Sequence, residues 1–526
     1  MEQSQNTPSF SPLANALLKS LEKTEAHGNH KKIAVNSLVS KVASWYEKLR
    51  NAMDYREEEV ILRAAIERIL KRRIILRGNG KKIAEPLVRE LMWARYFPDE
   101  SLSETVVGQI EKKVDLYLAF REAIVEKKIL KEAEASEWMY HLMSSDIEYF
   151  LNPLTERELA CNFMYQVMRN NISITDDTEQ NRDIQVFIAV RKAFSKDDLA
   201  FLRFHLFTQF FGHGITEASF SDVVEKFPLC YKEIQQQLSY PRKDRIYSYI
   251  KSKTGTFFIL DDLLDIYKGG IKELYSKKED FEKAVFDICE ARYSSIAGKI
   301  RRAVIRSVIF ILLTKVFFAF GVEGAFESLF YGSVSWKSIL LNTSIPPLLM
   351  IIASFFLRTP KHDNSERILH HLKAVLSKQD PEIGNPLVIK KNPDKRPFMN
   401  GIFTILWSLT YLLSFGAIVF VLTRLHFNPI SQGVFLFFVA IVSFLTYRIG
   451  LMSREYTVEG RQGALMPVFD FFFMPIVRVG SHLTEGISQI NILLFIFDFI
   501  IETPFKGIFG FFEQWFFFLR AKREEL

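Results

Sequence analysis

Four long apolar runs separate the hydrophobic pattern of the second half of the chain from that of the first half. A bilayer core needs about 20 mostly apolar residues in helical form, because backbone amides and carbonyls cannot stay unpaired in hydrocarbon. The runs that meet this requirement are Val304–Val322, Ser338–Leu357, Gly401–Leu422 and Ile430–Ile449. The pattern therefore predicts a polytopic membrane protein with about four transmembrane helices in residues 301–464.

The first 300 residues show a helical pattern without such runs. Apolar positions recur every three or four residues, as Leu62, Ile66, Ile69 and Leu70 do, and there is no alternating strand pattern. We expect a flexible polar tail at residues 1–35 and a cytoplasmic, all-helical soluble domain at residues 36–300. The expected helices after the first are Ile83–Arg95, Glu104–Ala135, Thr155–Asn170, Asp183–Phe194, Lys196–Phe211, Ser219–Leu238 and Tyr240–Tyr267, followed by one that runs toward the first span. The predicted fold class is all-α.

Charge is distributed unevenly between these two parts. Residues 1–300 hold 45 of the 68 basic and 45 of the 61 acidic side chains, so the net charge of +7 arises entirely after residue 300. Basic residues cluster before the first span, in the loop 358–399 and after the fourth span, and the positive-inside rule places these segments in the cytoplasm. This predicts a multi-pass protein of the cytoplasmic membrane with both termini inside.

A basic balance beside apolar spans favours anionic lipid headgroups as partners and not nucleic acid. The candidate headgroup ligands are the cations that flank apolar segments: Arg301, Arg302, Arg520, Lys522 and Arg523. A second basic run, Arg63–Lys82, is open to two interpretations. It is either an anionic-surface site or a solvent-exposed helix face paired with nearby glutamates.

The C-terminal residues 465–526 hold 14 of the 49 phenylalanines, in stretches too short to span and interrupted by Asp470, Pro475 and Pro504. We expect an amphipathic helix that lies in the membrane interface. Two alternatives stay open, namely a pair of re-entrant half-helices and core packing against the soluble domain.

Lys315 lies near the middle of the first span. A charge inside the membrane is costly and marks a functional-site candidate, with Asp470 or Asp498 as possible partners if the tail re-enters. The alternatives are that the span shifts and Lys315 extends its amine toward the interface, or that the segment is an amphipathic element and not a true span. Pro346 and Pro347 distort the second span, a feature that transporters use and that membrane helices also tolerate for packing.

The stretch "GTFFILDDLLDIYKG" carries Asp261, Asp262 and Asp265 in a DDxxD spacing. It is locally similar to the second aspartate-rich motif of the trans-prenyl diphosphate synthases, an all-α family in which such carboxylates bind magnesium and the substrate diphosphate. The resemblance implies that these three aspartates are metal-binding acids and that a second acidic cluster faces them. The nearest upstream candidate, Ile174–Asp183, does not reach the family's pattern.

The same aspartates also fit an ordinary surface helix. At about 100° per residue they share a polar wedge, while Phe257, Leu260, Leu264 and Tyr267 form an apolar face. The sequence leaves both interpretations open.

No other motif indicates chemistry. The sequence contains no P-loop, GxSxG, HExxH or GxGxxG motif, which argues against an enzyme, and it gives no reason to expect a cofactor. Its three cysteines are far apart, as is typical of a reduced compartment. The interpretation that fits best is a non-enzymatic membrane scaffold or assembly protein with protein partners. A channel or transporter is the first alternative, and a membrane-bound enzyme that acts on lipid or polyprenyl diphosphate through Asp261, Asp262 and Asp265 is the second.

Overall fold

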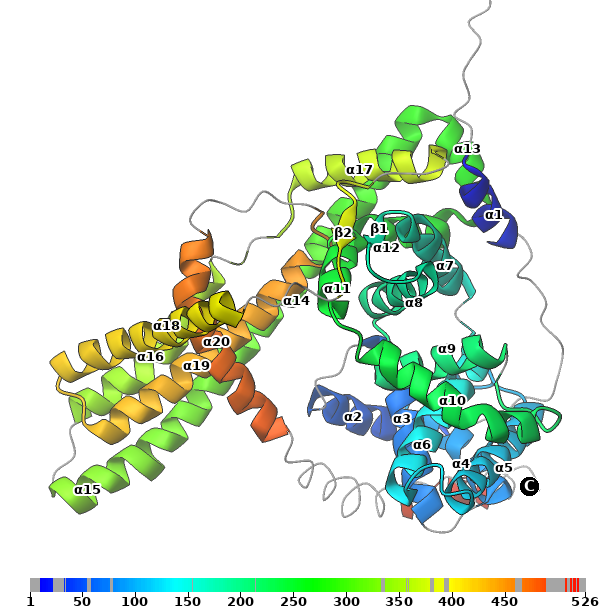
Figure 1. Cartoon of the computed structure of the whole chain (residues 1–526). Coiled ribbons are helices and arrows are strands. Elements are labelled where there is room, and N and C mark those ends of the chain that lie inside the picture. The colour runs from blue at the N-terminus through cyan, green and yellow to red at the C-terminus, as the bar shows by residue number, and fades with distance from the viewer. Residues whose placement is uncertain are drawn as a thin grey trace, which may run out of the picture. The chain divides into compact units, whose positions relative to one another are not determined.

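The computed structural model describes most of the chain and divides it into two compact units, whose elements are labelled in Figure 1. The described residues are 10–21, 33, 35–53, 58–75, 79–153, 155–212, 214–332, 336–355, 357, 359–378, 383–391, 397–458, 466–488, 507–508, 511–512, 514–516 and 518–519. We call one unit, Ser252–Ala374 and Asn392–Asn491 with Met1–Ser9, the apolar unit. The other, Phe10–Lys251, Val375–Lys391 and Ile492–Leu526, is the charged unit.

The described parts of both units are predominantly helical, which confirms the all-α prediction. The charged unit contains α1 (Pro12–Leu21), α2 (Ser37–Met53), η1 (Glu58–Val60), α3 (Ile61–Ile75), α4 (Gly80–Trp93), α5 (Glu104–Glu126), α6 (Glu132–Leu151), α7 (Thr155–Arg169), α8 (Glu179–Val190), the π-helix η2 (Arg191–Ser195), α9 (Leu199–Phe211), α10 (Phe220–Leu238) and α11 (Lys243–Lys251). Side-chain caps begin several of these helices. Thr178 accepts a hydrogen bond from the Asn181 amide, and Asp198 accepts from the amides of Ala200 and Phe201.

Large aromatic side chains fill the core of the charged unit. Trp138, Phe120 and Phe227 are fully buried, and both Phe120 and Trp138 meet Phe227 edge to face. Such contacts stabilise a core by about 0.5 to 1.5 kcal/mol each beyond the area they bury. These three residues come from α5, α6 and α10, so the core joins two neighbouring helices to a third that is far away in the sequence.

Two short parallel strands were not predicted. The strand β1 (Ile172–Ile174) pairs with β2 (Leu387–Ile389), with Ile172 opposite Leu387. Three residues are too few to establish an alternating pattern, and the partners lie more than 200 residues apart. The pairing ties residues 387–389 to the charged unit.

The apolar unit begins with α12 (Thr254–Tyr267), η3 (Lys268–Gly270) and α13 (Ile271–Ser276). It continues with α14 (Lys278–Phe318), the π-helix η4 (Ala319–Gly324), α15 (Ala325–Tyr331), α16 (Trp336–Ser354), α17 (His362–Ser377), α18 (Pro397–Arg424), α19 (Pro429–Arg454) and α20 (Met466–Ser488). The predicted boundary near residue 300 falls inside α14, which runs unbroken from a polar start to an apolar end. The last turn of α17 belongs to the charged unit.

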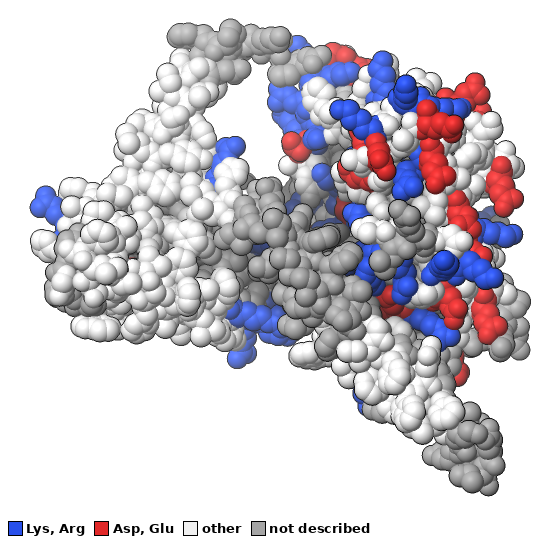
Figure 2. Space-filling model, turned by 90° about the horizontal axis from the view of Figure 1, so that it is seen from below, with Lys and Arg blue, Asp and Glu red and all other residues white. Residues whose placement is uncertain are grey.

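Three helices of the apolar unit are long and apolar enough to cross a membrane: Lys278–Phe330, Gly401–Arg424 and Pro429–Arg454. In the apolar windows of the first two, only 17% of the residues are buried inside the protein. Leu313 and Phe317 of α14 and Ile405 of α18 are among the large side chains left exposed. Figure 2 shows an extensive surface almost free of charged side chains. Such a surface fits hydrocarbon better than water.

The second predicted span, Ser338–Leu357, corresponds to α16, whose apolar part, Ile339–Ser354, is shorter than the three helices above. A further short apolar helical stretch, Phe471–Leu483, lies in α20. It packs closely on α19 because Gly480 has no side chain. A Cβ atom at Gly480 would lie 2.1 Å from the backbone oxygen of Ala440. Small residues at such crossings let two helix backbones approach each other.

Candidate functional site

Lys315 is fully buried in the apolar unit and forms an ion pair. Its Nζ lies 2.8 Å from Oε1 of Glu323, and both side chains have no exposed surface. The amine also lies 4.8 Å from the ring centroid of Phe438 on α19. The pair leaves no net charge inside the helix bundle, which lowers the cost of burying either member.

Neutral polar groups from two other helices complete this network. Asn342 of α16 donates a hydrogen bond of 2.6 Å from Nδ2 to Oε2 of Glu323, and Ser431 Oγ of α19 lies 3.3 Å from the same oxygen. Asn342 Nδ2 also lies 3.3 Å from the Ser431 carbonyl. The network therefore links α14, η4, α16 and α19. We call Lys315, Glu323, Asn342 and Ser431 the polar clamp.

The polar clamp lies near one end of the bundle. Asn342 is in the second turn of α16 and Ser431 in the first turn of α19, while Glu323 is in η4, after α14 has ended. A π-helix has a widened turn and is frequent at functional sites. Here it carries the carboxylate that reaches back to the amine of Lys315.

The partner of Lys315 differs from the one that the sequence suggested. Asp470 and Asp498 were the proposed partners, whereas the structure pairs Lys315 with Glu323, eight residues along the chain. Sequence reasoning missed Glu323 because an ideal helix would place it two turns away. The Asp470 side chain and Asp498 lie outside the described residues.

The three aspartates of α12 are not brought together with a second acidic cluster among the described residues, where no group of three or more potential ligands could hold a metal ion. Asp262 instead pairs with Arg292 of α14, with 2.7 Å between Oδ2 and Nε. Asp261 is half-buried and Asp265 is exposed. Phe257, Leu260 and Leu264 are buried, as the apolar face predicted, but Tyr267 is exposed. Residues 254–260 are buried on every side, so α12 is a surface helix only in its second half.

The predicted headgroup ligands are described only in part. Arg301 and Arg302 are exposed on α14, next to its apolar segment. Arg520, Lys522 and Arg523 lie outside the described residues. In the tail, Phe516 packs against the core of the charged unit, whereas Phe511 and Phe518 are exposed.

The basic run Arg63–Lys82 fits the second interpretation in part, because Lys71 is exposed and pairs with Glu67, but two of its arginines are buried. Arg63 is buried and pairs with Glu67 and with Asp198 at the start of α9. Arg72 and Arg73 both pair with Glu90 of α4, and Arg72 is also buried. These arginines join helices inside the charged unit, whereas Lys71, Lys81 and Lys82 remain exposed.

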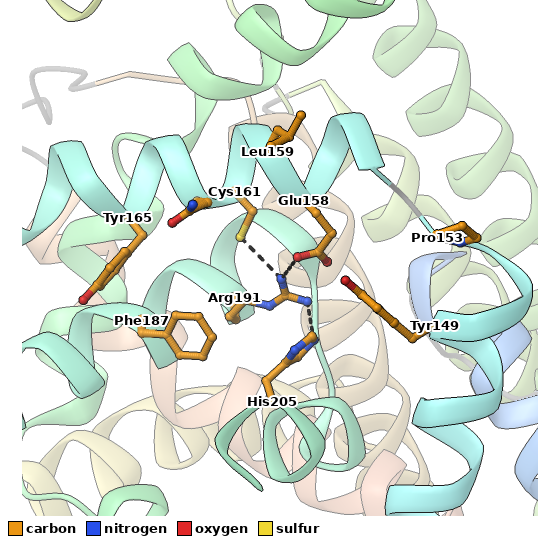
Figure 3. Close-up of a pocket in the computed structure, with 10 residues that line it drawn as sticks. Tyr149, Pro153, Glu158, Leu159, Cys161, Tyr165, Phe187, Arg191 and His205 are labelled. Carbon is orange, nitrogen blue, oxygen red and sulfur yellow. Dashed lines mark hydrogen bonds and ion pairs between the residues drawn. The ribbon is translucent and has the colours of Figure 1, made fainter. Parts of the chain in front are cut away.

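Another buried arginine, Arg191, is the centre of a polar cluster at the π-helix η2. Its Nη1 lies 2.6 Å from Oε2 of Glu158, and its Nε lies 2.7 Å from Oδ2 of Asp197. Its other terminal nitrogen contacts Nε2 of His205. Figure 3 shows Glu158, Cys161 and His205 arranged around the guanidinium group. After η2 the backbone turns through Lys196, whose φ of 60° is left-handed.

Burial changes the acidity of this cluster. It raises the pKa of Asp197 to about 6, although Arg191 opposes the shift, and it raises the pKa of the Cys161 thiol to about 11. Burial and the nearby Arg191 hold the pKa of His205 well below its usual value. His205 is therefore neutral, and Cys161 is a protonated thiol, at neutral pH. Neighbouring Glu148 has a pKa raised to about 8, mainly by burial.

Comparison with known proteins gives no relative: no protein-family model, no curated protein and no solved structure matches this chain.

Proposed function

We propose that this chain is a multi-pass protein of the cytoplasmic membrane that acts as a scaffold, with the apolar unit as anchor and the charged unit as the part that binds partners. The three helices that could cross a membrane support the anchor. With α16 as a fourth span, the basic segments would lie on one side and both termini would be cytoplasmic. Anionic headgroups would then contact Arg301 and Arg302.

The polar clamp is the observation that carries this proposal. It uses its ammonium, carboxylate and amide groups in bonds between helices and lies where α16 and α19 begin. Polar bonds of this kind hold transmembrane helices together. An ion path would instead need groups free to exchange their partners along the length of the bundle.

Partner binding by the charged unit would use exposed apolar side chains. On α2, Trp45 is 64% exposed and Val42 is 47% exposed, one helical turn apart. Isolated exposed residues are common, but a tryptophan beside a valine on one helix face is a suitable contact for a protein partner.

The experiment places a photo-crosslinking amino acid at position 45 of the full chain and, in a matched control, at the exposed position Glu122. We expect one reproducible adduct in intact membranes from position 45 and none from Glu122. Identical adducts from both positions would contradict the scaffold proposal. A reporter fused at residue 380 tests the topology, and an external location there would contradict it.

A second candidate function is cation transport, favoured by the π-helix η4 beside the Lys315–Glu323 pair and by Pro346 and Pro347 within α16. Proteoliposomes that contain the full chain distinguish the two functions. The scaffold proposal expects no proton or sodium flux above that of empty vesicles. Flux that disappears in the double variant Lys315→Met/Glu323→Gln would favour transport.

A further inference from the structure

Two cavities of the charged unit share Tyr165 in their lining. The first, of about 390 Å³, is lined by residues of α6, α7, α8, η2 and α9, including Arg191 and His205. The second, of about 620 Å³, lies among α7, α8, α9 and α10. Both have the size of ordinary small-molecule sites. Because Tyr165 lines both, an elongated ligand that crosses its ring would occupy them together.

Arg191 is poorly placed to bind an anion in the first cavity. Its bonds to Glu158, Asp197 and His205 use all three of its nitrogens, and a fourth contact of 3.8 Å reaches the Cys161 sulfur. An anionic ligand would have to displace a carboxylate that already forms a charge-assisted bond. Glu158 and Asp197 together also outweigh the single charge of Arg191. The cavity therefore favours a cation, at the part of Glu158 that remains exposed.

The second cavity also favours a cation, because its lining is more acidic than that of the first cavity. Its lining includes two carboxylates, Asp183 and Glu233, and no lysine or arginine. Asp183 pairs with Arg169 and Arg182, but no described residue forms an ion pair with Glu233. The side-chain oxygens of Gln180 and Gln209 can accept further hydrogen bonds from a bound amine.

Aromatic rings line both cavities. Tyr149 and Phe187 lie on opposite sides of Arg191 in the first cavity (Figure 3), and Phe210 joins Tyr165 in the second. A cation above such a ring is attracted by its π electrons, and more strongly when the cation is removed from water. A carboxylate beside aromatic rings in each cavity suits an ammonium group with an aliphatic stem.

We propose that the charged unit binds an elongated aliphatic polyamine, with one ammonium group at Glu158, another at Glu233 and the chain between them across Tyr165. Two lysine side chains of a peptide would present the same chemistry. This inference does not depend on the proposed scaffold function, because it concerns cavities within one unit.

The test measures spermidine binding to the full-length protein in detergent micelles by titration calorimetry. Fully acetylated spermidine, which has the same chain without charge, serves as the ligand control. We expect saturable binding of spermidine only, and about tenfold weaker binding in each of Glu158→Gln and Glu233→Gln, because each removes one charged contact. Tyr165→Ala should weaken binding as well, whereas Tyr165→Phe should retain it.

The matched control is Glu122→Gln, which removes an exposed carboxylate elsewhere in the same unit and should leave affinity unchanged. Equal weakening in this control would show nonspecific charge attraction and overturn the proposal. Absence of saturable spermidine and tetralysine binding, or equal binding of the acetylated ligand, would also overturn it. Tighter binding of a tetralysine peptide than of spermidine would support the site and assign it to a protein ligand. Protection of the buried Cys230 thiol from alkylation confirms that each variant is folded.

Discussion

The two units bury charge in different ways. In the apolar unit, one ammonium group, on Lys315, meets one carboxylate, on Glu323, and the other partners are neutral. In the charged unit, two of the buried arginines each meet two carboxylates: Arg63 binds Glu67 and Asp198, and Arg191 binds Glu158 and Asp197. At Glu90 the ratio is reversed, because Arg72 and Arg73 both bind it. The Lys315–Glu323 network therefore balances its charges one to one, whereas the clusters around Arg63 and Arg191 each hold an excess of acid.

The reason for this difference is the solvent each unit can reach. The side chains of Glu158 and Asp198 are 31% and 28% exposed, so water solvates part of the excess charge. Where water does not reach, burial raises the pKa values of the Asp197 and Glu148 carboxyls, and the neighbouring carboxylates add to the shift. Both members of the Lys315–Glu323 pair are completely buried, so water could not solvate an excess charge there.

The largest expected effect comes from breaking that balance. Lys315→Met or Glu323→Gln alone should destabilise the apolar unit by about 3 to 5 kcal/mol, because each leaves a buried charge without its partner. The double variant Lys315→Met/Glu323→Gln should recover most of this loss. The measurement is the alkylation rate of Cys289, the buried thiol of the apolar unit, in a chain that lacks Cys161 and Cys230. Additive losses in the double variant would mean that the pair does not couple the helices.

The next effect tests backbone packing in the same unit. Gly480→Ala should destabilise the apolar unit by about 2 to 3 kcal/mol, since the added Cβ overlaps the Ala440 backbone oxygen and the helices must separate. Gly433→Ala is the matched control, because no atom lies within 4 Å of a Cβ at that position of α19. The same Cys289 alkylation assay should show no loss of protection for the control. Equal effects of the two substitutions would indicate helix propensity and not packing as the cause.

Much of the helical framework follows from local pattern alone. The expected helix Thr155–Asn170 is observed as α7 at Thr155–Arg169, and Ser219–Leu238 is observed as α10 at Phe220–Leu238. Errors occur where local pattern carries little information. The expected helix Glu104–Ala135 is two helices, α5 and α6, because the chain turns at Lys128, whose φ of 55° is left-handed. Glycine and asparagine are the residues that usually indicate such a turn, and a lysine does not.

The candidate sites depended on contacts that no local pattern contains. Lys315 was identifiable because a charge inside an apolar run is rare, but its bond to Glu323 needs the π-helix η4. Arg191 and Asp197 lie at the two ends of an irregular segment. The sequence around them is no different from that around exposed arginines and aspartates, so it does not indicate that they are buried. Their burial follows from the packing of α7 and α9, which sequence periodicity does not specify.

A pH measurement tests the acid excess around Arg63 and Arg191. Glu148 has a pKa near 8 in the folded chain and an ordinary value of 4.5 when unfolded, so the folded state holds a proton that the unfolded state releases. Stability from this group is complete below pH 4.5 and is lost as the pH rises through 8. Asp197 and Asp198 add to the upward shift, and Arg63 opposes it.

Between pH 6.5 and 8.5 the free energy of unfolding of the parent chain should fall by about 2 kcal/mol because Glu148 ionises. Glu148→Gln, which imitates the protonated acid, should not show this fall. Protection of Cys230 from alkylation, with the other cysteines replaced, reports the stability of the charged unit. The difference between the two chains isolates Glu148, since other titrating groups are common to both. Parallel pH profiles would show that Glu148 is ionised in the folded state.

The smallest expected effect concerns the aspartates of α12, which are less enclosed than either set of buried charges. Arg292 is 46% exposed in its pair with Asp262, and ion pairs of this kind contribute less than about 1 kcal/mol. Asp262→Asn should therefore change Cys289 protection only slightly, and addition of magnesium should not alter the stability of the parent chain. Asp265→Asn, at an exposed position without a described ion pair, is the matched control and should have no effect. Magnesium-dependent stabilisation that is lost in Asp262→Asn would reverse this view, because Arg292 would then occupy the place of a metal ion and the resemblance to a diphosphate-binding motif would describe a real site.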